Sequence, residues 1–175
     1  MRLEQEAVSV EVLAPDGTRA TVPLSRWEEA DGEVVGLAMP WQDTTLTLRS
    51  SDFWEALREL RQVLERNGTL LCCYGTSRNV YPSPMMRQMG AGDQAYKLEL
   101  RRPARQGDIV DIFATGPDLH PATVAAQEAF CEEWLKTLVS GKSGRLMVTR
   151  RAPLRACGAG VGPRSPWAGG PWARS

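Results

Sequence analysis

The chain has 175 residues, 42% hydrophobic and 24% charged, which is long and apolar enough for one domain with its own core. No run reaches the roughly 18 apolar residues of a membrane-spanning helix, and the four cysteines and single histidine lack zinc-type spacing, so no metal or cofactor is expected. The net charge is zero, but all 21 acidic and only 14 of the 21 basic residues lie in residues 1–141, which therefore carry about −7.

The first ten residues contain acidic side chains where a secretory signal would have a basic and then an apolar stretch. We therefore expect a cytoplasmic protein. Nearly all basic residues are arginine, and alanine, glycine and proline are abundant, a composition that indicates a GC-rich bacterial genome.

Short alternating stretches fill the first 50 residues and predict an antiparallel meander of four strands. Residues 7–13 and 19–24 flank a Pro-Asp-Gly-Thr turn and predict a hairpin. Residues 33–39 and 44–49 predict the third and fourth strands. Pro23 lacks a backbone donor, so we expect the second strand to end there or to lie at the edge of the sheet.

Residues 52–66 have the periodicity of an amphipathic helix. Asp52 can cap its first turn, and Glu55, three residues further on, can complete a capping box. The apolar face consists of Phe53, Leu57, Leu60 and Leu64. The polar face, which we expect to meet solvent, consists of Glu55, Arg58, Glu59, Arg61 and Gln62. The Asn-Gly pair that follows predicts the end of the helix.

Three further strands are predicted beyond this helix. Residues 69–74 form a nearly all-apolar run, which is typical of a central strand covered on both faces. Residues 95–101 alternate, with Tyr96, Leu98 and Leu100 expected to face inward, and residues 108–113 form the last strand. Helices mixed with mostly antiparallel strands predict an α+β fold, in which two amphipathic helices cover a mainly antiparallel sheet.

The second helix is predicted from about Pro121 to Ser140, with proline in its first turn. Its mostly apolar stripe consists of Val124, Gln127, Cys131, Trp134, Leu135 and Leu138. We expect a single domain over residues 1–141, followed by a basic tail, residues 142–175, that is rich in Gly, Pro and Arg and largely disordered. Only residues 145–149 of the tail have the pattern of a strand.

Nucleic-acid binding by this tail would combine its arginines with Trp167 and Trp172. We disfavour it because the positive charges are dispersed and the acidic body would repel a polyanion.

Residues 75–93 connect two predicted strands, and so long a connection in a compact domain is functional or contains a small element. Ser83 as a cap, Pro84 in the first turn and Gly90 past the end predict one or two helical turns from Ser83 to Met89. Three methionines cannot all face inward on so short a helix: Met85, Met86 and Met89. They either fill a gap over the sheet, which is the simpler interpretation, or form an adaptable contact surface for another protein.

Aromatic and basic residues complete the predicted binding surface around these methionines: Tyr74, Arg78, Tyr81 and Arg87. Such a surface on an acidic body predicts a small protein that binds a macromolecule, its partner being another protein with a basic surface. One concrete form is an inhibitor or immunity-type protein that covers a basic toxin or enzyme. A subunit of a homo-oligomer is a further possibility for the same apolar rim.

The alternative is an enzyme or a small-anion-binding protein that uses a pocket beside residues 75–90, because residues 75–79 can present backbone N–H groups to an anion. The two hypotheses predict different geometries. Convergence of Tyr74, Arg78 and Arg87 in a closed pocket would favour a ligand, whereas methionines exposed on a convex rim would favour a protein partner.

No catalytic residues are predicted. One candidate is a nucleophile–base pair of Cys73 and His120, with Asp111 or Asp118 as the orienting carboxylate. We disfavour it because Cys73 lies in the most apolar run of the chain, where burial makes a thiol inert. Two pairs of carboxylates lie near each other in the sequence but are expected to point apart on their strand or helix: Asp108 and Asp111, and Glu132 and Glu133.

Overall fold

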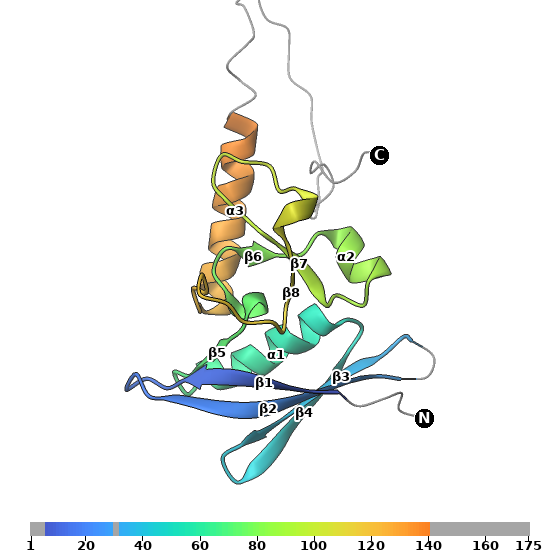
Figure 1. The fold of residues 1–175 in the computed structure, drawn as a ribbon, viewed down its shortest axis with the longest axis vertical. Coiled ribbons are helices and arrows are strands. Elements are labelled where there is room, and N and C mark those ends of the chain that lie inside the picture. Colours follow the sequence, from blue (N-terminus) through green and yellow to red (C-terminus); the bar gives the residue numbers. More distant parts are fainter. Residues whose placement is uncertain (1–5, 30–31, 141–175) are drawn as a thin grey trace, which may run out of the picture.

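The computed structural model describes residues 6–29 and 32–140, which form an α+β fold with two antiparallel sheets (Figure 1). The five-stranded sheet has the order β4-β3-β2-β1-β5, and the three-stranded sheet has the order β6-β7-β8. The predicted fold class is confirmed, with the difference that most of the later strands form a sheet of their own. None of the described helices is long and apolar enough to cross a membrane.

The predicted four-strand meander is confirmed: β1 (Glu6–Leu13), β2 (Arg19–Glu28), β3 (Val35–Trp41) and β4 (Thr44–Ser50). The prediction for Pro23 holds in part: β2 does not end there but continues to Glu28, between β1 and β3. The proline is tolerated because β3 pairs only with Ser25–Glu28, so that Pro23 has a partner strand on one side alone. β2 is therefore an edge strand over part of its length only.

The first helix, α1 (Phe53–Glu65), lies across the inner face of the five-stranded sheet and supplies the centre of the core. Asp52 caps it by accepting a hydrogen bond from the Glu55 N–H at 2.8 Å, as predicted. The Glu55 carboxylate does not complete a capping box with the cap residue; it binds the guanidinium groups of Arg58 and Arg87.

Arg61 corrects the prediction that one face of α1 meets solvent, because its side chain is only 2% exposed. Figure 1 gives the reason: α1 lies between the large sheet on one side and the second layer, with the small sheet and α3, on the other. The guanidinium donates to the side-chain oxygen of Gln127 at 2.6 Å and to backbone carbonyls of Gly75 and Ala122. A charged side chain thus joins the two layers.

β5 (Leu70–Cys72) has three residues and lies at the edge of the large sheet, paired only with β1. The prediction of a central strand over residues 69–74 is therefore wrong. The apolar run is nevertheless buried, because the chain turns at Cys73 into the short 3-10 helix η1 (Tyr74–Thr76) in the interior. Burial on both sides here comes from an irregular segment and not from neighbouring strands.

The small sheet consists of β6 (Val80–Tyr81), β7 (Gln94–Lys97) and β8 (Ile109–Asp111), and the short 3-10 helix η2 (Gln106–Asp108) precedes β8. Leu98 is buried and Tyr96 half-buried, as expected. Leu100 is 37% exposed, contrary to prediction, because β7 ends at Lys97 and the chain turns at Arg101 with a φ of 66°.

The last helix, α3 (Val124–Ser140), begins after Pro121, which pairs with Ser77 in an isolated bridge. Thr123 serves as its cap by accepting a hydrogen bond from the Ala126 N–H at 3.2 Å. Pro121 therefore precedes the helix and does not lie in its first turn, contrary to prediction. The predicted stripe is confirmed: Val124, Gln127, Cys131 and Trp134 are buried, and Leu135 and Leu138 half-buried. The predictions for a disordered tail over residues 142–175 and for a strand at residues 145–149 lie outside the described residues.

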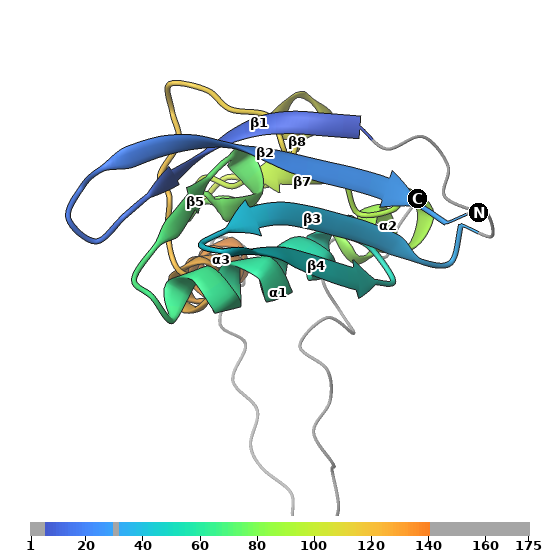
Figure 2. The same cartoon turned by 90° about the horizontal axis from the view of Figure 1, so that it is seen from below.

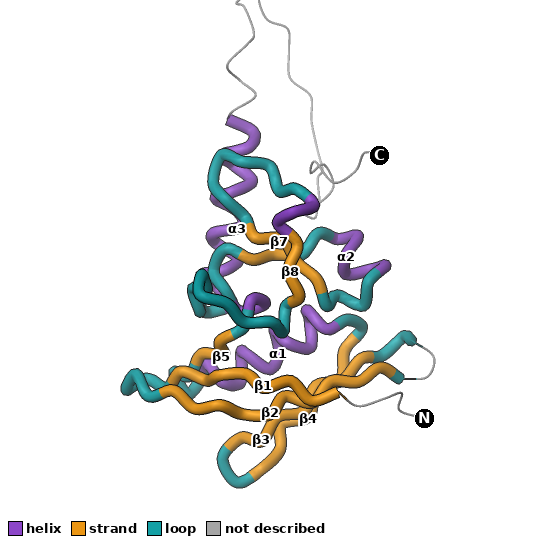
Figure 3. Tube along the Cα trace, viewed as in Figure 1, coloured by secondary structure: helices purple, strands orange, loops and turns teal. Residues whose placement is uncertain are grey.

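Figure 2 shows the other face of the large sheet from below, and no described helix covers it. The tube in Figure 3 separates this strand-rich layer from an upper part that consists mainly of helices and loops. The segment from η1 to β7, which contains α2, belongs to the upper part and reaches one flank of the molecule.

Candidate functional site

α2 (Pro84–Met89) is the short helix predicted within the long connection. The Ser83 hydroxyl accepts from the Met86 N–H at 3.3 Å, and Pro84 occupies the first turn, where it displaces no hydrogen bond. The Gly90 N–H donates to the Met86 carbonyl at 3.2 Å and ends the helix. Its cap, first residue and stop were therefore all readable from the sequence.

Arg87 fixes α2 to the beginning of α1. Its guanidinium donates to one Asp52 carboxylate oxygen from Nη2 at 2.9 Å and from Nε at 3.1 Å, and also to Glu55 at 3.1 Å. The Asp52 side chain is 7% exposed and also caps α1. After α2 the chain returns at Gly92, where a φ of +73° would strain any other residue and a Cβ would come within 2.9 Å of the Asp52 carboxylate. One carboxylate thus joins two helices.

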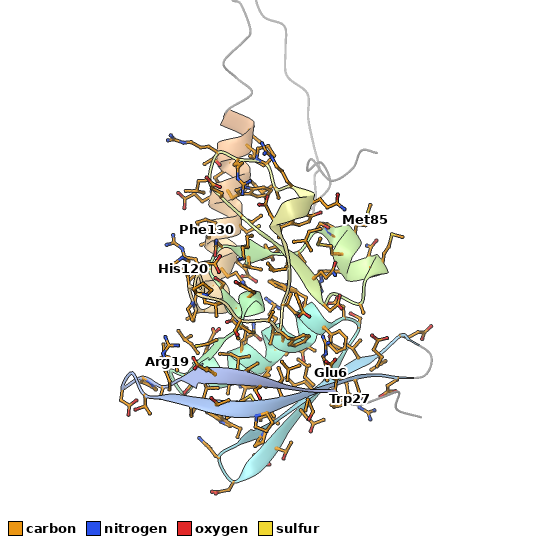
Figure 4. The ribbon with its side chains drawn as sticks, in the orientation of Figure 1. Glu6, Arg19, Trp27, Met85, His120 and Phe130 are labelled. Carbon is orange, nitrogen blue, oxygen red and sulfur yellow. The ribbon has the colours of Figure 1, made fainter. Side chains whose placement is uncertain are left out.

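Two of the three methionines of α2 point outward. Met85 is 55% exposed and Met89 82% exposed, while Met86 is half-buried. Figure 4 shows Met85 projecting from the flank of the molecule. The gap-filling interpretation is therefore wrong for Met85 and Met89, which lie four residues apart on one face of the helix.

A cleft of about 560 Å³ adjoins α2. It is lined by Ser51, Asp52, Tyr81, Pro82, Pro84, Arg87 and Gln88. The Tyr81 ring packs edge-on against Trp54, with ring centroids 5.2 Å apart. Burial raises the pKa of the Tyr81 hydroxyl to about 12, so it remains protonated at neutral pH. The cleft is therefore lined by the aromatic ring of Tyr81 and by the ion pair of Arg87 with Asp52.

Tyr74 does not join this surface. It is 9% exposed and its hydroxyl donates to one oxygen of Asp118 at 2.7 Å, while Lys97 donates to the other oxygen at 2.7 Å. The ammonium also lies 4.1 Å from the centre of the Tyr74 ring. The hydrogen bonds from Lys97 and Tyr74 lower the pKa of Asp118 to about 2. A Cβ at Gly116 would overlap the Tyr74 hydroxyl, so only glycine fits beside this group.

Arg78 lies on the flank opposite α2. Its guanidinium is 5.1 Å from the centre of the Phe130 ring, and its N–H donates to the His120 carbonyl at 2.8 Å. Figure 4 places both Phe130 and His120 across the molecule from Met85. Of the seven residues predicted to form one surface, the structure brings five together around α2 and separates Tyr74 and Arg78 from them.

The first four backbone N–H groups of residues 75–79 are engaged within the protein. The N–H groups of Gly75, Thr76, Ser77 and Arg78 donate to carbonyls of Ile112, Cys73, Tyr74 and His120 respectively. They are thus not available to an anion. Arg87, the one arginine of the cleft lining, is likewise paired with two carboxylates.

The disfavoured catalytic arrangement has no geometric support in the described structure. Cys73 is completely buried, and burial raises the pKa of its thiol to about 12, whereas His120 is exposed. Asp118 is bound to Tyr74 and Lys97, and Asp111 accepts from the Phe113 N–H at 2.7 Å. Over residues 6–29 and 32–140, no three His, Cys, Asp or Glu side chains are grouped to hold a metal ion.

Sequence reasoning missed two polar clusters: the buried contact of Arg61 with Gln127, and the partly exposed group of Tyr74, Asp118 and Lys97. A glutamine within the apolar stripe of α3 was the one signal that pointed to the first. The sequence matches no known protein-family model, and no curated protein is significantly similar to it.

Proposed function

We propose that the chain binds another protein, one with a basic surface, through the α2 surface, which we define as Tyr81, Met85, Met86, Arg87, Met89 and the adjoining cleft. The observation that carries this proposal is the exposure of Met85 and Met89, at 55% and 82%, on a helix that is anchored to the body. Methionine side chains adapt to the shape of a partner and are common at binding surfaces. An anchored helix also loses little conformational freedom on binding.

The charge around the α2 surface supports a basic partner. Asp52 and Glu55 bind Arg87, and Glu55 and Glu128 bind Arg58. Three carboxylates therefore share two guanidinium groups, and this connected cluster keeps a net charge of −1 beside the cleft. The wider body, at about −7 over residues 1–141, would accelerate association with a positively charged protein.

An inhibitor or immunity-type protein of a bacterial cytoplasm, which covers a basic toxin or enzyme, is the concrete form of this proposal. A small-anion site or an enzyme is less well supported, since Arg78 does not reach the cleft and Arg87 already has two carboxylate partners. The cleft is better suited to receive a partner side chain than a free anion.

The proposal is tested with the full chain as bait in extracts of the cells that produce it. The informative variant combines Met85→Glu with Met89→Glu. The matched control is Val139→Glu, which replaces an apolar side chain that is 71% exposed and lies on α3. We expect a partner with a basic surface to bind the unchanged chain and the control, and to bind the double variant at least about tenfold more weakly. Affinity should also fall as salt rises.

Both variants alter exposed side chains, so urea unfolding should show all three proteins equally stable. The proposal is wrong if the double variant captures the same partner with unchanged affinity. A partner that carries a strongly acidic surface would also contradict it.

A further inference from the structure

β4 carries an open strand edge. It pairs with β3 along all seven of its residues, Thr44–Ser50, and with no other strand among those that the structure describes. The register is one-to-one from end to end, without a bulge. β5, at the other edge of the same sheet, has only three residues before the chain turns away.

The turn between β3 and β4 decides which backbone groups face outward. Gln42 and Asp43 form a two-residue loop closed by Trp41 and Thr44, and Gln42 has the positive φ, 51°, of such hairpins. The pair that closes a loop of this kind is hydrogen-bonded, and bonded and non-bonded pairs alternate along the ladder. The residues that point N–H and C=O away from β3 are therefore Thr45, Thr47 and Arg49.

The side chains leave this edge unprotected. Natural edge strands avoid pairing by means of proline, lysine, bulges or inward-pointing charges. β4 has one charged residue, Arg49, and its guanidinium is drawn 3.3 Å from a carboxylate oxygen of Glu29. On the core side Leu46 and Leu48 are only half-buried, since the sheet stops beside them.

We propose that a second copy of the chain adds its β4 antiparallel to this edge, about a twofold axis at Thr47. The segment is self-complementary in that register: Leu46 lies opposite Leu48, and Thr45 opposite Arg49, so no like charges face each other. Thr47 faces its own copy with N–H and C=O both directed across the interface. The pairing joins the two sheets into one and covers the half-buried leucines of both copies.

The dimer leaves the α2 surface accessible. Figure 1 shows the β3–β4 hairpin projecting from the base of the molecule, and α2 lies in the upper layer. Each dimer thus presents two α2 surfaces. A single strand pair gives an interface at the small end of the specific range, so we expect association in the micromolar range, with a Kd of about 1–100 µM.

Sedimentation equilibrium of the full chain over about 1–200 µM tests the proposal, since dimerisation follows mass action. We expect the average mass to rise from 19.3 kDa towards twice that value. Thr47→Pro removes an N–H that points away from β3 and leaves every bond between β4 and β3 intact. Thr47→Lys places two ammonium groups, one from each copy, next to each other at the twofold axis. Each should weaken dimerisation at least about tenfold. The control, Thr21→Lys, adds the same charge to an exposed position of β2 and should dimerise normally.

Circular dichroism of each variant establishes that it is folded, and Thr47→Lys keeps the test decisive if Thr47→Pro does not fold. A chain that stays monomeric over the whole concentration range overturns the proposal. So does a dimer whose affinity neither Thr47 variant reduces, because its interface would then lie elsewhere.

Discussion

Gln127 of α3 provides a sharp test of how the two layers of the molecule are joined. The side chain is 2% exposed, and its oxygen accepts from Nη1 of Arg61 at 2.6 Å. Its Nε2 lies 3.0, 2.8 and 2.9 Å from three carbonyl oxygens, those of Gly75, Ser77 and Val80. One amide thus connects α3 to α1, η1 and β6.

Gln127→Leu keeps a similar volume but removes every one of these bonds. Burial lowers the pKa of Arg61, yet a guanidinium stays protonated in proteins, so a buried positive charge loses an acceptor. Arg61 retains bonds to Gly75 and Ala122 and an ion pair with Glu65 at 3.7 Å. A buried polar group without a partner costs about 1–3 kcal/mol, and more when it is charged. We therefore expect the free energy of unfolding to fall by about 3–5 kcal/mol.

Urea unfolding followed by circular dichroism measures this loss, and a cycle with Arg61→Leu isolates the contact. Removal of both partners leaves fewer unpaired groups, so the double variant should be less destabilised than the sum of the single variants by about 1–3 kcal/mol. Gln62→Leu, on α1, is the control and should change stability by about 0.5 kcal/mol or less. Additive effects, or a loss below about 1 kcal/mol for Gln127→Leu, would refute the reasoning.

Two further predictions concern the core and the response to acid. Leu60→Ala should lower the free energy of unfolding by about 2–5 kcal/mol in urea titrations, because Leu60 is 1% exposed at the centre of the core. A free energy of unfolding that hardly changes would mean that the site collapses without leaving a cavity. Asp118 has a pKa lowered from 3.8 to about 2 by its bonds from Lys97 and Tyr74, so its contribution is present above about pH 4 and is lost as pH falls through about 2. The stability difference between the unchanged chain and Asp118→Asn should shrink over that window, and a difference that is constant with pH would contradict the assignment.

The elements that the sequence predicted well depend on signals a few residues apart. The capping of α1 by Asp52, the Ser83 cap and Gly90 stop of α2, and the alternation of the first four strands all act within one turn or one strand pair. Local hydrogen bonds and periodicity suffice for these elements, since each is satisfied by its immediate neighbours in the chain.

The errors arose where an element has a second neighbour in space. The environment of Pro23 depends on how far β3 pairs with β2, and the burial of residues 69–74 depends on an irregular turn. Neither can be read from the local sequence. Tyr74 and Arg78 stand four residues apart in the chain but turn to different partners, Asp118 and Phe130. Spacing along the chain could not reveal those directions.

By itself the sequence determined the type of fold, the helix stripes and the existence of α2, because these follow from local backbone preferences and from the segregation of apolar side chains. The tertiary structure alone decided that Arg61 is buried, through a partner 66 residues away, and that α2 is tied to the body by a contact that spans 35 residues, from Arg87 to Asp52. The physical reason is that burial of a polar side chain, and exposure of an apolar one, depend on which distant segments cover it.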